Sequence, residues 1–392
     1  MNRRLPTLSA FVLMAFLISA CGGGAATPTS ATKADAKPTQ AAAPASSPSA
    51  AAAASPGAAA SPAASAGGSA AGKPVARAVQ DPGPCTAANA TKPLPSGKAR
   101  LVIGTGGTGG VYFPYGGGLA RIVTARLPNA EMTAEVTGGS VDNMKLINAG
   151  EADLGMSTAD SAYDAFNGTD VYKDTGKISA CAIAVPYDSF IHIIALGDSN
   201  INTVADMKGK RISVGSAGSS TEGAADRILE VAGLDPRRDV VRDNLGVAES
   251  VGALKDRKIE AMFWIGGLPT AAVTDLVQTP NMRVKFIPGQ PYIEPLRAKF
   301  GPLYTPFALP RTTYAGLDAD VPGIGIGNMI FVNANMNEGL VYDILKTIFD
   351  NLSEVQQIHP EARSLTLAGA ASSTSIPFHP GAVRFYQERG VW

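Results

Sequence analysis

The chain has 392 residues with a formal net charge of zero, and its sequence pI is near 6.8. A protein that binds nucleic acid needs a basic face, so this charge balance excludes that class of function. The three histidines and three cysteines do not cluster at metal-ligand spacing, so we expect neither a metal site nor a cofactor.

The first residues have the pattern of an export signal. Arg3 and Arg4 precede the apolar stretch LPTLSAFVLMAFLISA, which is shorter than the roughly 20 residues that span a bilayer as a helix. Ile18-Ser19-Ala20-Cys21 resembles a bacterial lipoprotein box. We therefore predict a lipoprotein signal peptide over residues 1–20 and a lipid on Cys21, which anchors an extracytoplasmic protein to the membrane. The alternative is an ordinary secretory signal with an incidental cysteine.

Residues 21–97 consist mainly of Ala, Pro, Ser, Thr and Gly. Such a segment cannot bury enough apolar surface to offset its ordering entropy, so we predict a disordered tether. No run of 18 or more apolar residues follows Cys21, so we expect no membrane span in the body, residues 98–392. Outside the cytoplasm, Cys85 and Cys181 can persist as a disulfide, and two unpaired thiols are the other interpretation.

Apolar runs and segments of helical period alternate along the body. The first part predicts strands at 100–104, 131–139 and 152–158, each followed by a helix, at 113–127, 140–150 and 159–168. Residues 178–196 contain Pro186 and are too long for one strand, which indicates two. The pattern restarts with strands at 211–216, 239–245, 259–267 and 282–289, helices at 220–233, 247–257 and 268–278, an extended run at 324–336 and an amphipathic helix at 337–352. This β-α-β order predicts parallel sheets in two α/β lobes, with a ligand cleft between them.

The first predicted strand leads into a glycine-dense segment, GTGGTGGVYFPYGGG, at residues 104–118. Its G-x-G-x-x-G spacing gives a tight turn before a helix start, which favours an anion. A dinucleotide site would need an acidic residue after the next strand, where the chain has Thr137-Gly138-Gly139-Ser140, and a P-loop would need a lysine after the glycines. We therefore expect a small anion here, and a turn that needs positive φ is the alternative.

Two further helix starts are rich in hydroxyl groups. TGGSVDNM places Ser140 where an N-cap is expected, and in SVGSAGSSTEG Ser219 stands three residues before Glu222, which fits a capping box. A helix needs one capping hydroxyl, so the others are expected to face a polar ligand: Ser216, Ser220 and Thr221. FWIGGLP puts Trp264 at a strand end, either in the cleft or in the core.

No catalytic constellation stands out beside these loops. The chain has no G-x-S-x-G nucleophile elbow. His192 lies in an apolar strand, where a satisfied core or hinge histidine is expected. We therefore predict that the protein is not an enzyme.

Several segments occur in a characteristic order: GTGGTGGVYFPYGGGLA, VTGGSVDNMKLINAGEADLGM, SVGSAGSSTE, ESVGALKDRKIEAMFWIGGLPT and GNMIFVNANM. Over nearly all of residues 98–392 the chain resembles the TAXI family, the solute receptors of tripartite ATP-independent periplasmic (TRAP) transporters. The resemblance implies a two-lobed periplasmic-binding-protein fold of type II, membrane subunits as partners, and ligands such as glutamate, glutamine or 2-oxoglutarate. MSTAD, residues 156–160, stands where relatives usually have a Gln-Ser-Asp pattern, so the contacts of this stretch stay unassigned.

We therefore predict lobe 1 at residues 98–187 and 317–392, lobe 2 at residues 188–316, and a small organic anion between them. An extracytoplasmic enzyme on the same fold and a ligand-sensing subunit of a signalling system are the alternatives. No Lys or Arg lies in the three loops, so backbone N–H groups and hydroxyls are expected to hold the anion, with Arg311 as a candidate for a second carboxylate. The expected ligand-binding residues are Thr105, Gly107, Thr108, Tyr112, Ser140, Asn143, Ser216, Ser219, Ser220, Thr221, Trp264 and Gly267.

Overall fold

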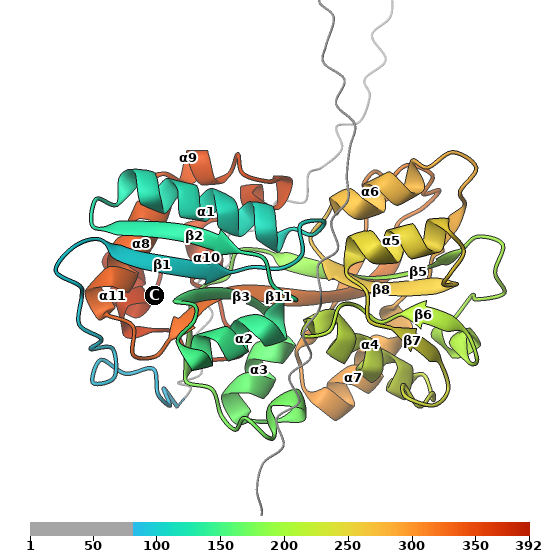
Figure 1. Ribbon diagram of the computed structural model, residues 1–392, viewed down its shortest axis with the longest axis horizontal. Helices are drawn as coiled ribbons and strands as arrows, with labels where there is room; N and C mark the ends of the chain where they lie inside the picture. The colour runs from blue at the N-terminus through green and yellow to red at the C-terminus, as the bar shows by residue number, and fades with distance from the viewer. Residues whose placement is uncertain (1–80) are drawn as a thin grey trace, which may run out of the picture. The chain divides into compact units, whose positions relative to one another are not determined.

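The computed structural model describes residues 81–392, all within one compact unit (Figure 1). The predicted signal peptide, Cys21 and most of the predicted tether lie outside the described residues. Three large hydrophobic clusters organise this part of the chain. The first draws on residues from Ala99 to Tyr187 and from Met329 to Tyr386, and the other two draw on residues from Phe190 to Ile326. The fold is a two-lobed α/β structure, in which the first lobe contains the first cluster and the second lobe contains the other two.

The first lobe contains the predicted β-α-β-α-β unit. Strand β1 (Ala99–Gly104) lies between β2 (Ala130–Glu135) and β3 (Leu154–Thr158) and pairs with both in parallel. Helix α1 lies on the opposite side of these strands from α2 and α3 (Figure 1). The helices are α1 (Tyr112–Arg126), α2 (Ser140–Ala149) and α3 (Ala159–Asn167). Because all three strands run the same way, their carboxyl ends and the starts of α1 and α2 meet at one edge.

The second lobe repeats this arrangement. Strand β6 (Arg211–Ser213) pairs in parallel with β7 (Val241–Asp243) and β8 (Ala261–Gly266). Strand β5 (Asp188–Leu196) is antiparallel to both β8 and β9 (Val284–Phe286). The helices that follow the parallel strands are α4 (Ser220–Val231), α5 (Val247–Lys255) and α6 (Ala271–Val277).

Strand β11 (Val321–Asn333) belongs to both lobes. Its first half pairs antiparallel with β10 (Tyr304–Leu309) and β5, and its second half with β3 and β4 (Ala180–Ala184). Strands β4 and β5 are joined by the short link Val185–Tyr187, so the chain passes between the lobes there as well. The strand order is β2-β1-β3-β11-β5-β8-β6-β7, and β11 runs across the middle of Figure 1.

The structure contains several elements that the hydrophobic pattern of the sequence does not predict. Residues 290–323, for which the sequence pattern predicts no regular element, contain η3 (Gln290–Tyr292), α7 (Ile293–Phe300) and β10. The end of the chain forms α8 (Glu338–Asp350), which was predicted, and then α9 (Leu352–Val355), η4 (Pro360–Ser364), α10 (Leu367–Ala370) and α11 (Pro380–Glu388). The remaining short turns are η1 (Asp170–Tyr172) and η2 (Val204–Met207). Among the described helices, none has both the length and the apolar character to cross a membrane.

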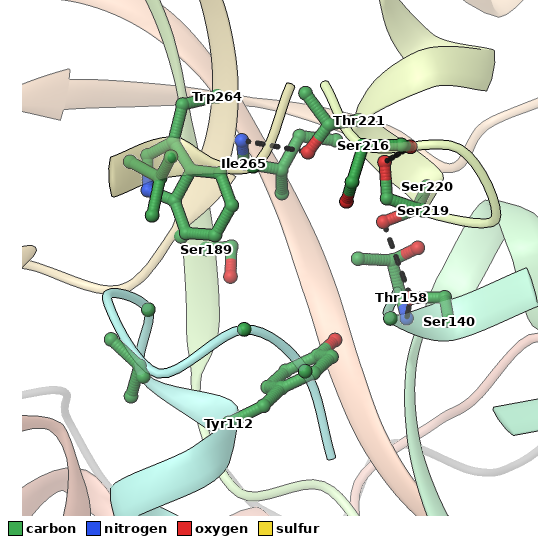
Figure 2. A pocket seen from close by; sticks show the side chains of 18 of the residues that line it. Tyr112, Ser140, Thr158, Ser189, Ser216, Ser219, Ser220, Thr221, Trp264 and Ile265 are labelled. Atoms are coloured by element: carbon green, nitrogen blue, oxygen red, sulfur yellow. Dashed lines mark hydrogen bonds between the residues drawn. The ribbon is translucent and has the colours of Figure 1, made fainter. Parts of the chain in front are cut away.

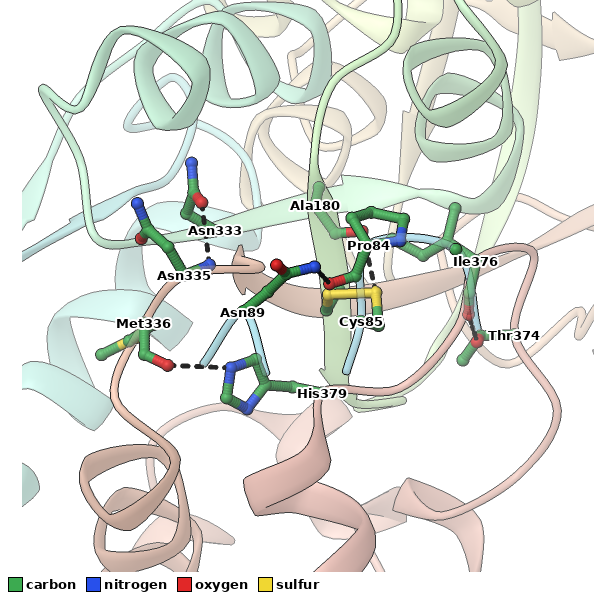
Figure 3. The surroundings of a disulfide bond; sticks show 12 residues. Pro84, Cys85, Asn89, Ala180, Asn333, Asn335, Met336, Thr374, Ile376 and His379 are labelled. Atoms are coloured by element: carbon green, nitrogen blue, oxygen red, sulfur yellow. Dashed lines mark hydrogen bonds between the residues drawn. A yellow bond between two sulfur atoms is a disulfide. The ribbon is translucent and has the colours of Figure 1, made fainter. Parts of the chain in front are cut away.

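The last stretch of the predicted tether is part of the body. Cys85 forms a disulfide with Cys181 of β4, with an S–S distance of 2.11 Å (Figure 3). The backbone N–H of Lys92 donates to the carbonyl of Asn335 at 2.9 Å, and that of Glu338 donates to Ala90 at 3.1 Å. The predicted tether boundary at residue 97 is therefore too late, because a covalent bond and backbone hydrogen bonds hold a segment that has few large apolar side chains.

Candidate functional site

A cavity of about 50 Å³ lies between the two lobes. Its walls come from the loop after β1, the starts of α1 and α2, the start of α4 and the end of β8. Figure 2 shows the Tyr112 ring on one side and the hydroxyls of the α4 start on another. The lining residues are Gly106, Gly107, Gly110, Val111, Tyr112, Gly138, Gly139, Ser140, Thr158, Tyr187, Ser189, Ser216, Ser219, Ser220, Thr221, Gly246, Val247, Trp264, Ile265 and Gly266.

Hydrogen bonds cross from one lobe to the other at the edge of this cavity. The Ser216 hydroxyl donates to the carbonyl of Gly138 at 3.0 Å, and the Ser140 hydroxyl donates to that of Ser220 at 3.2 Å. The carbonyl of Gly218 accepts from two of the free N–H groups in the first turn of α2, those of Val141 and Asp142, at 3.1 Å each. The second lobe thus caps a helix of the first, which describes a closed arrangement of the lobes.

Glycines make this contact close. A Cβ on Gly138 would lie 2.5 Å from the backbone oxygen of Ala217 in the other lobe. Gly218 has φ +77°, a left-handed conformation that favours glycine, and a Cβ there would lie 2.1 Å from the carboxylate of Asp142. The two backbones therefore approach each other at a distance that side chains would prevent.

The starts of α4 and α2 agree only in part with what the sequence predicts. Ser219 is the N-cap of α4, because its hydroxyl accepts from the N–H of Glu222 at 3.3 Å, as predicted. The carboxylate of Glu222 pairs instead with Arg242 at 2.8 Å. Ser140 does not cap α2, whose N-cap is Gly139, and the Ser140 hydroxyl accepts from the N–H of Thr158 at 3.2 Å. The Ser140 hydroxyl therefore links strand β3 to the second lobe.

Aromatic side chains form the less polar walls. The indole N–H of Trp264 donates to the Thr270 hydroxyl at 3.0 Å, and the Tyr112 hydroxyl donates to Asn328 Oδ1 at 2.6 Å. Burial raises the pKa of Tyr112 well above its usual value, so this phenol stays neutral at physiological pH. Of the two places that the sequence leaves open for Trp264, the cleft and the core, the structure has it in the cavity wall.

Tyr187 contributes a hydroxyl that the protein leaves unpaired. Within the described residues its Oη is buried and has no hydrogen-bond partner. Burial raises the pKa of Tyr187 strongly, and Tyr112 and Glu361 raise it further by smaller amounts. The nearby Ser189 hydroxyl lowers this pKa, although it is not placed to form a hydrogen bond of ordinary geometry with Tyr187. A buried neutral phenol on a cavity wall is a donor for a bound acceptor.

Eight of the twelve predicted ligand-binding residues line the cavity: Gly107, Tyr112, Ser140, Ser216, Ser219, Ser220, Thr221 and Trp264. The other four do not. Thr105 is buried and its hydroxyl donates to the carbonyl of Glu135, while Asn143 donates to the carbonyls of Thr105 and Met156 at 2.7 and 2.8 Å. Thr108 is exposed, and Gly267 lies against Glu361. Thr105 and Asn143 therefore satisfy the backbone under the glycine loop rather than facing the cavity.

Sequence reasoning left Tyr187 and Thr158 unassigned and missed Ser189. Ser189 lies one residue into β5 and Thr158 at the end of β3, so neither belongs to a glycine-rich loop. The signal that points to Tyr187 and Ser189 is their position after Pro186, where the chain passes between two predicted strands.

Charged contacts between the lobes lie outside the cavity. Glu361 of η4 accepts from the backbone N–H of Leu268, which follows β8. Burial raises the pKa of Glu361 to about 7. Arg227 of α4 reaches the first lobe, where it pairs with Asp164 and Asp170.

His192 is buried, its Nε2 lies 3.1 Å from the Tyr314 hydroxyl, and burial lowers its pKa to about 4. It is a core histidine, as predicted. No group of three or more His, Cys, Asp or Glu side chains in residues 81–392 is placed to hold a metal ion.

The solved structures that match this protein have low sequence identity to it. The periplasmic aliphatic sulphonate binding protein SsuA from Escherichia coli is 17% identical over 74% of this chain and 83% of its own, with a TM-score of 0.39. The alkanesulfonate-binding protein SsuA from Xanthomonas axonopodis pv. citri is 17% identical over 75% and 92%, with a TM-score of 0.40. A putative L-cystine ABC transporter protein from Listeria monocytogenes is 14% identical over 71% and 99%, with a TM-score of 0.42.

The sequence itself identifies the family. The profile of the NMT1-like family matches residues 103–390, which begin in β1 and extend beyond α11, and so include both lobes and every wall of the cavity. The chain therefore belongs to the NMT1-like family.

Proposed function

We propose that this protein is the extracytoplasmic solute receptor of a TRAP transporter and that it binds a small organic anion between its lobes. The observation that carries the proposal is the cavity itself. Hydroxyl and backbone groups of both lobes converge on it, and hydrogen bonds join the lobes around it. Glutamate, glutamine and 2-oxoglutarate, which the TAXI resemblance suggests, are the first ligands to test.

The same geometry supports a closing mechanism. A ligand that contacts the start of α4 and the phenol of Tyr112 touches both lobes at once, so it binds the closed arrangement more tightly than an open one. Only such differential affinity can shift the population of states. The closed form would then dock on membrane subunits, which are separate chains.

Trp264 offers a direct test of binding. The chain has two tryptophans, and Trp392 is 42% exposed, away from the cavity walls. In a Trp392→Phe variant, fluorescence therefore reports on Trp264 alone. We expect a saturable change on titration with a small organic anion, and no change in a Trp264→Phe variant that retains Trp392. If no organic anion in a broad panel produces such a change or any heat of binding, the receptor proposal fails.

The transporter assignment needs a separate experiment. Proteoliposomes with TRAP membrane subunits should accumulate the ligand only when this protein is added. If the liganded protein instead engages a signalling partner, it is a sensor, and if NMR shows a new product that depends on cavity residues, it is an enzyme.

The proposed lipid anchor on Cys21 is testable in the native host. We expect the membrane fraction to contain a mature protein that begins with a diacylglyceryl cysteine, and a Cys21→Ser variant to leave that fraction. A wild-type protein that is unmodified and released would contradict the anchor.

A further inference from the structure

The cavity has an uncharged wall. Its lining consists of glycines, serines, threonines, aliphatic side chains, two tyrosines and one tryptophan, and no Asp, Glu, Lys, Arg or His lines it within the described residues. Arg311, the candidate for a second carboxylate, is exposed and does not line the cavity. Any charge on the ligand can therefore interact only with backbone dipoles and hydroxyl groups of the wall.

Hydrogen-bond donors remain available in this wall. Tyr187 Oη has no partner in the part of the chain that the structure describes. The hydroxyl of Ser189 accepts from Asn328 Nδ2 at 2.9 Å, and that of Thr221 accepts from the N–H of Ile265 at 3.2 Å. Each of these hydroxyls keeps its own proton to donate. All three residues are at most 5% exposed, so a ligand acceptor is the natural partner for these protons.

Three helix starts add positive electrostatic potential at the cavity. Helices α1, α4 and α5 begin there, and the residues at these starts that line the cavity are Val111 and Tyr112, Ser219 to Thr221, and Gly246 and Val247. The N–H groups at a helix start carry partial positive charge and favour an anion. The start of α2 contributes less, because its first N–H groups already donate to Gly218. Donor hydroxyls and helix starts together favour one anionic group.

A second charged group of either sign would lack a counterpart. Burying an unpaired ion costs several kcal/mol unless a partner of opposite charge or strong hydrogen bonds compensate it. A second carboxylate would find no cation in the wall, and an ammonium would find no carboxylate. The aliphatic side chains of Val111, Val247 and Ile265 offer contacts to an apolar chain instead. At about 50 Å³, which corresponds to roughly three to five water molecules, the space suits a compact ligand.

Building on the receptor function proposed above, we infer that the ligand is a compact monocarboxylate with an apolar chain and no second charged group. The carboxylate accepts from the hydroxyls of Tyr187, Ser189 and Thr221 and from the N–H groups at the start of α4. The inference disfavours glutamate, glutamine and 2-oxoglutarate, which the sequence resemblance suggests, because each of them carries a second charged group.

Four five-carbon compounds test the inference, because they differ mainly in charge. 2-Oxopentanoate is a monoanion, 2-oxoglutarate a dianion, norvaline a zwitterion, and pentanamide is neutral. Calorimetry on the purified full-length chain should give at least tenfold tighter binding for 2-oxopentanoate than for each of the other three. Tightest binding of 2-oxoglutarate, norvaline or pentanamide would overturn the monocarboxylate inference and leave the receptor proposal intact. Absence of binding by all four, and by glutamate and glutamine, would overturn the inference, and the broad panel above then decides the receptor proposal separately.

Two phenylalanine substitutions locate the carboxylate. Tyr187→Phe removes one hydrogen bond to a charged group, so we expect at least tenfold weaker binding of 2-oxopentanoate. Tyr115→Phe is the matched control, because Tyr115 Oη is also buried without a partner but does not line the cavity, and its ring centroid lies 5.7 Å from that of Tyr187. Thermal unfolding without ligand shows whether each variant is folded, and Ser189→Ala is a second cavity variant expected to weaken binding. Equal affinity in Tyr187→Phe, Ser189→Ala and the wild type would overturn the placement of the carboxylate.

Discussion

Arg227 of helix α4 forms an ion pair with Asp170 of the first lobe, with 2.8 Å between Nη2 and Oδ2. The same nitrogen contacts Asp164, and the Tyr304 hydroxyl links Arg227 to Asp160, at 3.2 and 3.1 Å. Only 8% of the Arg227 side chain is exposed. Burial opposes its charge, but Tyr304 and the two buried carboxylates raise the pKa of Arg227 above its usual value. The lobes are therefore joined by a buried charged cluster as well as by the hydrogen bonds at the edge of the cavity.

Substituting Arg227→Ala should destabilise the protein by about 3–5 kcal/mol, because it leaves the carboxylates of Asp160 and Asp164 buried without their cation. The deficit should shrink as pH falls, because burial raises the pKa of Asp164 above its usual value, so this carboxylate takes up a proton more readily than an exposed one. Urea unfolding measures both effects. Arg237→Ala is the control: its side chain is 63% exposed in its pair with Asp226, so we expect a loss below about 1 kcal/mol. Equal losses in the two variants would contradict the structural role of the cluster.

Glu361 should make stability depend on pH. Burial and the nearby Asp188 raise its pKa to about 7, against an unperturbed 4.5, while the N–H of Leu268 opposes the shift. The folded state then binds more protons than the unfolded state between pH 4.5 and 7, so its stability falls as pH rises through this window. The tyrosines on which Glu361 acts, Tyr115, Tyr187 and Tyr314, stay neutral there.

A Glu361→Gln variant keeps an acceptor for Leu268 but cannot ionise. We expect it to be more stable than the wild type by about 1–3 kcal/mol at pH 8 and equally stable at pH 4.5. Thermal unfolding across this pH range measures the difference. A constant difference at all pH values would show that Glu361 is not the titrating group.

Gly138→Ala tests the contact between the lobes. Its Cβ would lie 2.5 Å from the backbone oxygen of Ala217 when the lobes are together. It would also lie 2.5 Å from Asp142 Oδ2 of the first lobe, but that carboxylate is on a side chain that can turn away, so ligand affinity should fall at least tenfold while the first lobe stays folded. Gly223→Ala is the matched control inside α4, where no atom lies within 4 Å of the added Cβ. It should leave affinity unchanged and raise stability by up to about 1 kcal/mol. Calorimetry and thermal unfolding of both variants decide the matter, and an unaffected affinity in Gly138→Ala would count against closure.

Substitutions at Ser219 and Thr221 should distinguish a hydroxyl that caps helix α4 from one that contacts the ligand. The Ser219 hydroxyl accepts from Glu222 and donates to the Ser216 carbonyl at 2.7 Å, so Ser219→Ala should cost about 0.5–2 kcal/mol of stability and change affinity little. Ser219→Asn should restore the cap. Thr221→Val removes a hydroxyl with a free proton and should weaken binding about tenfold. A large affinity loss in Ser219→Ala, not rescued by asparagine, would assign Ser219 to the ligand instead.

The sequence predicts most of the elements because their signal is local. Helix α8 and strand β1 follow from hydrophobic period and from their flanking residues. The wall of the cavity is harder to predict, because Asn143 and Ser220 are both polar residues in the first turn of a helix that follows a glycine-rich loop. Only the packing of the lobes shows that Asn143 serves buried carbonyls while Ser220 lines the cavity. For Tyr187 the sequence offers only its position after Pro186, because its role depends on where the two lobes meet.

The Cys85–Cys181 disulfide determines where a mechanical load enters the protein. A pull on the chain before residue 81 would pass through Cys85 into β4, and so into the first lobe, before it reached any strand of the second. The second lobe would carry no tension and would be free to swing about β11 and the β4–β5 link. An anchor at this end, as proposed above for Cys21, would therefore place no load on a movement of one lobe relative to the other.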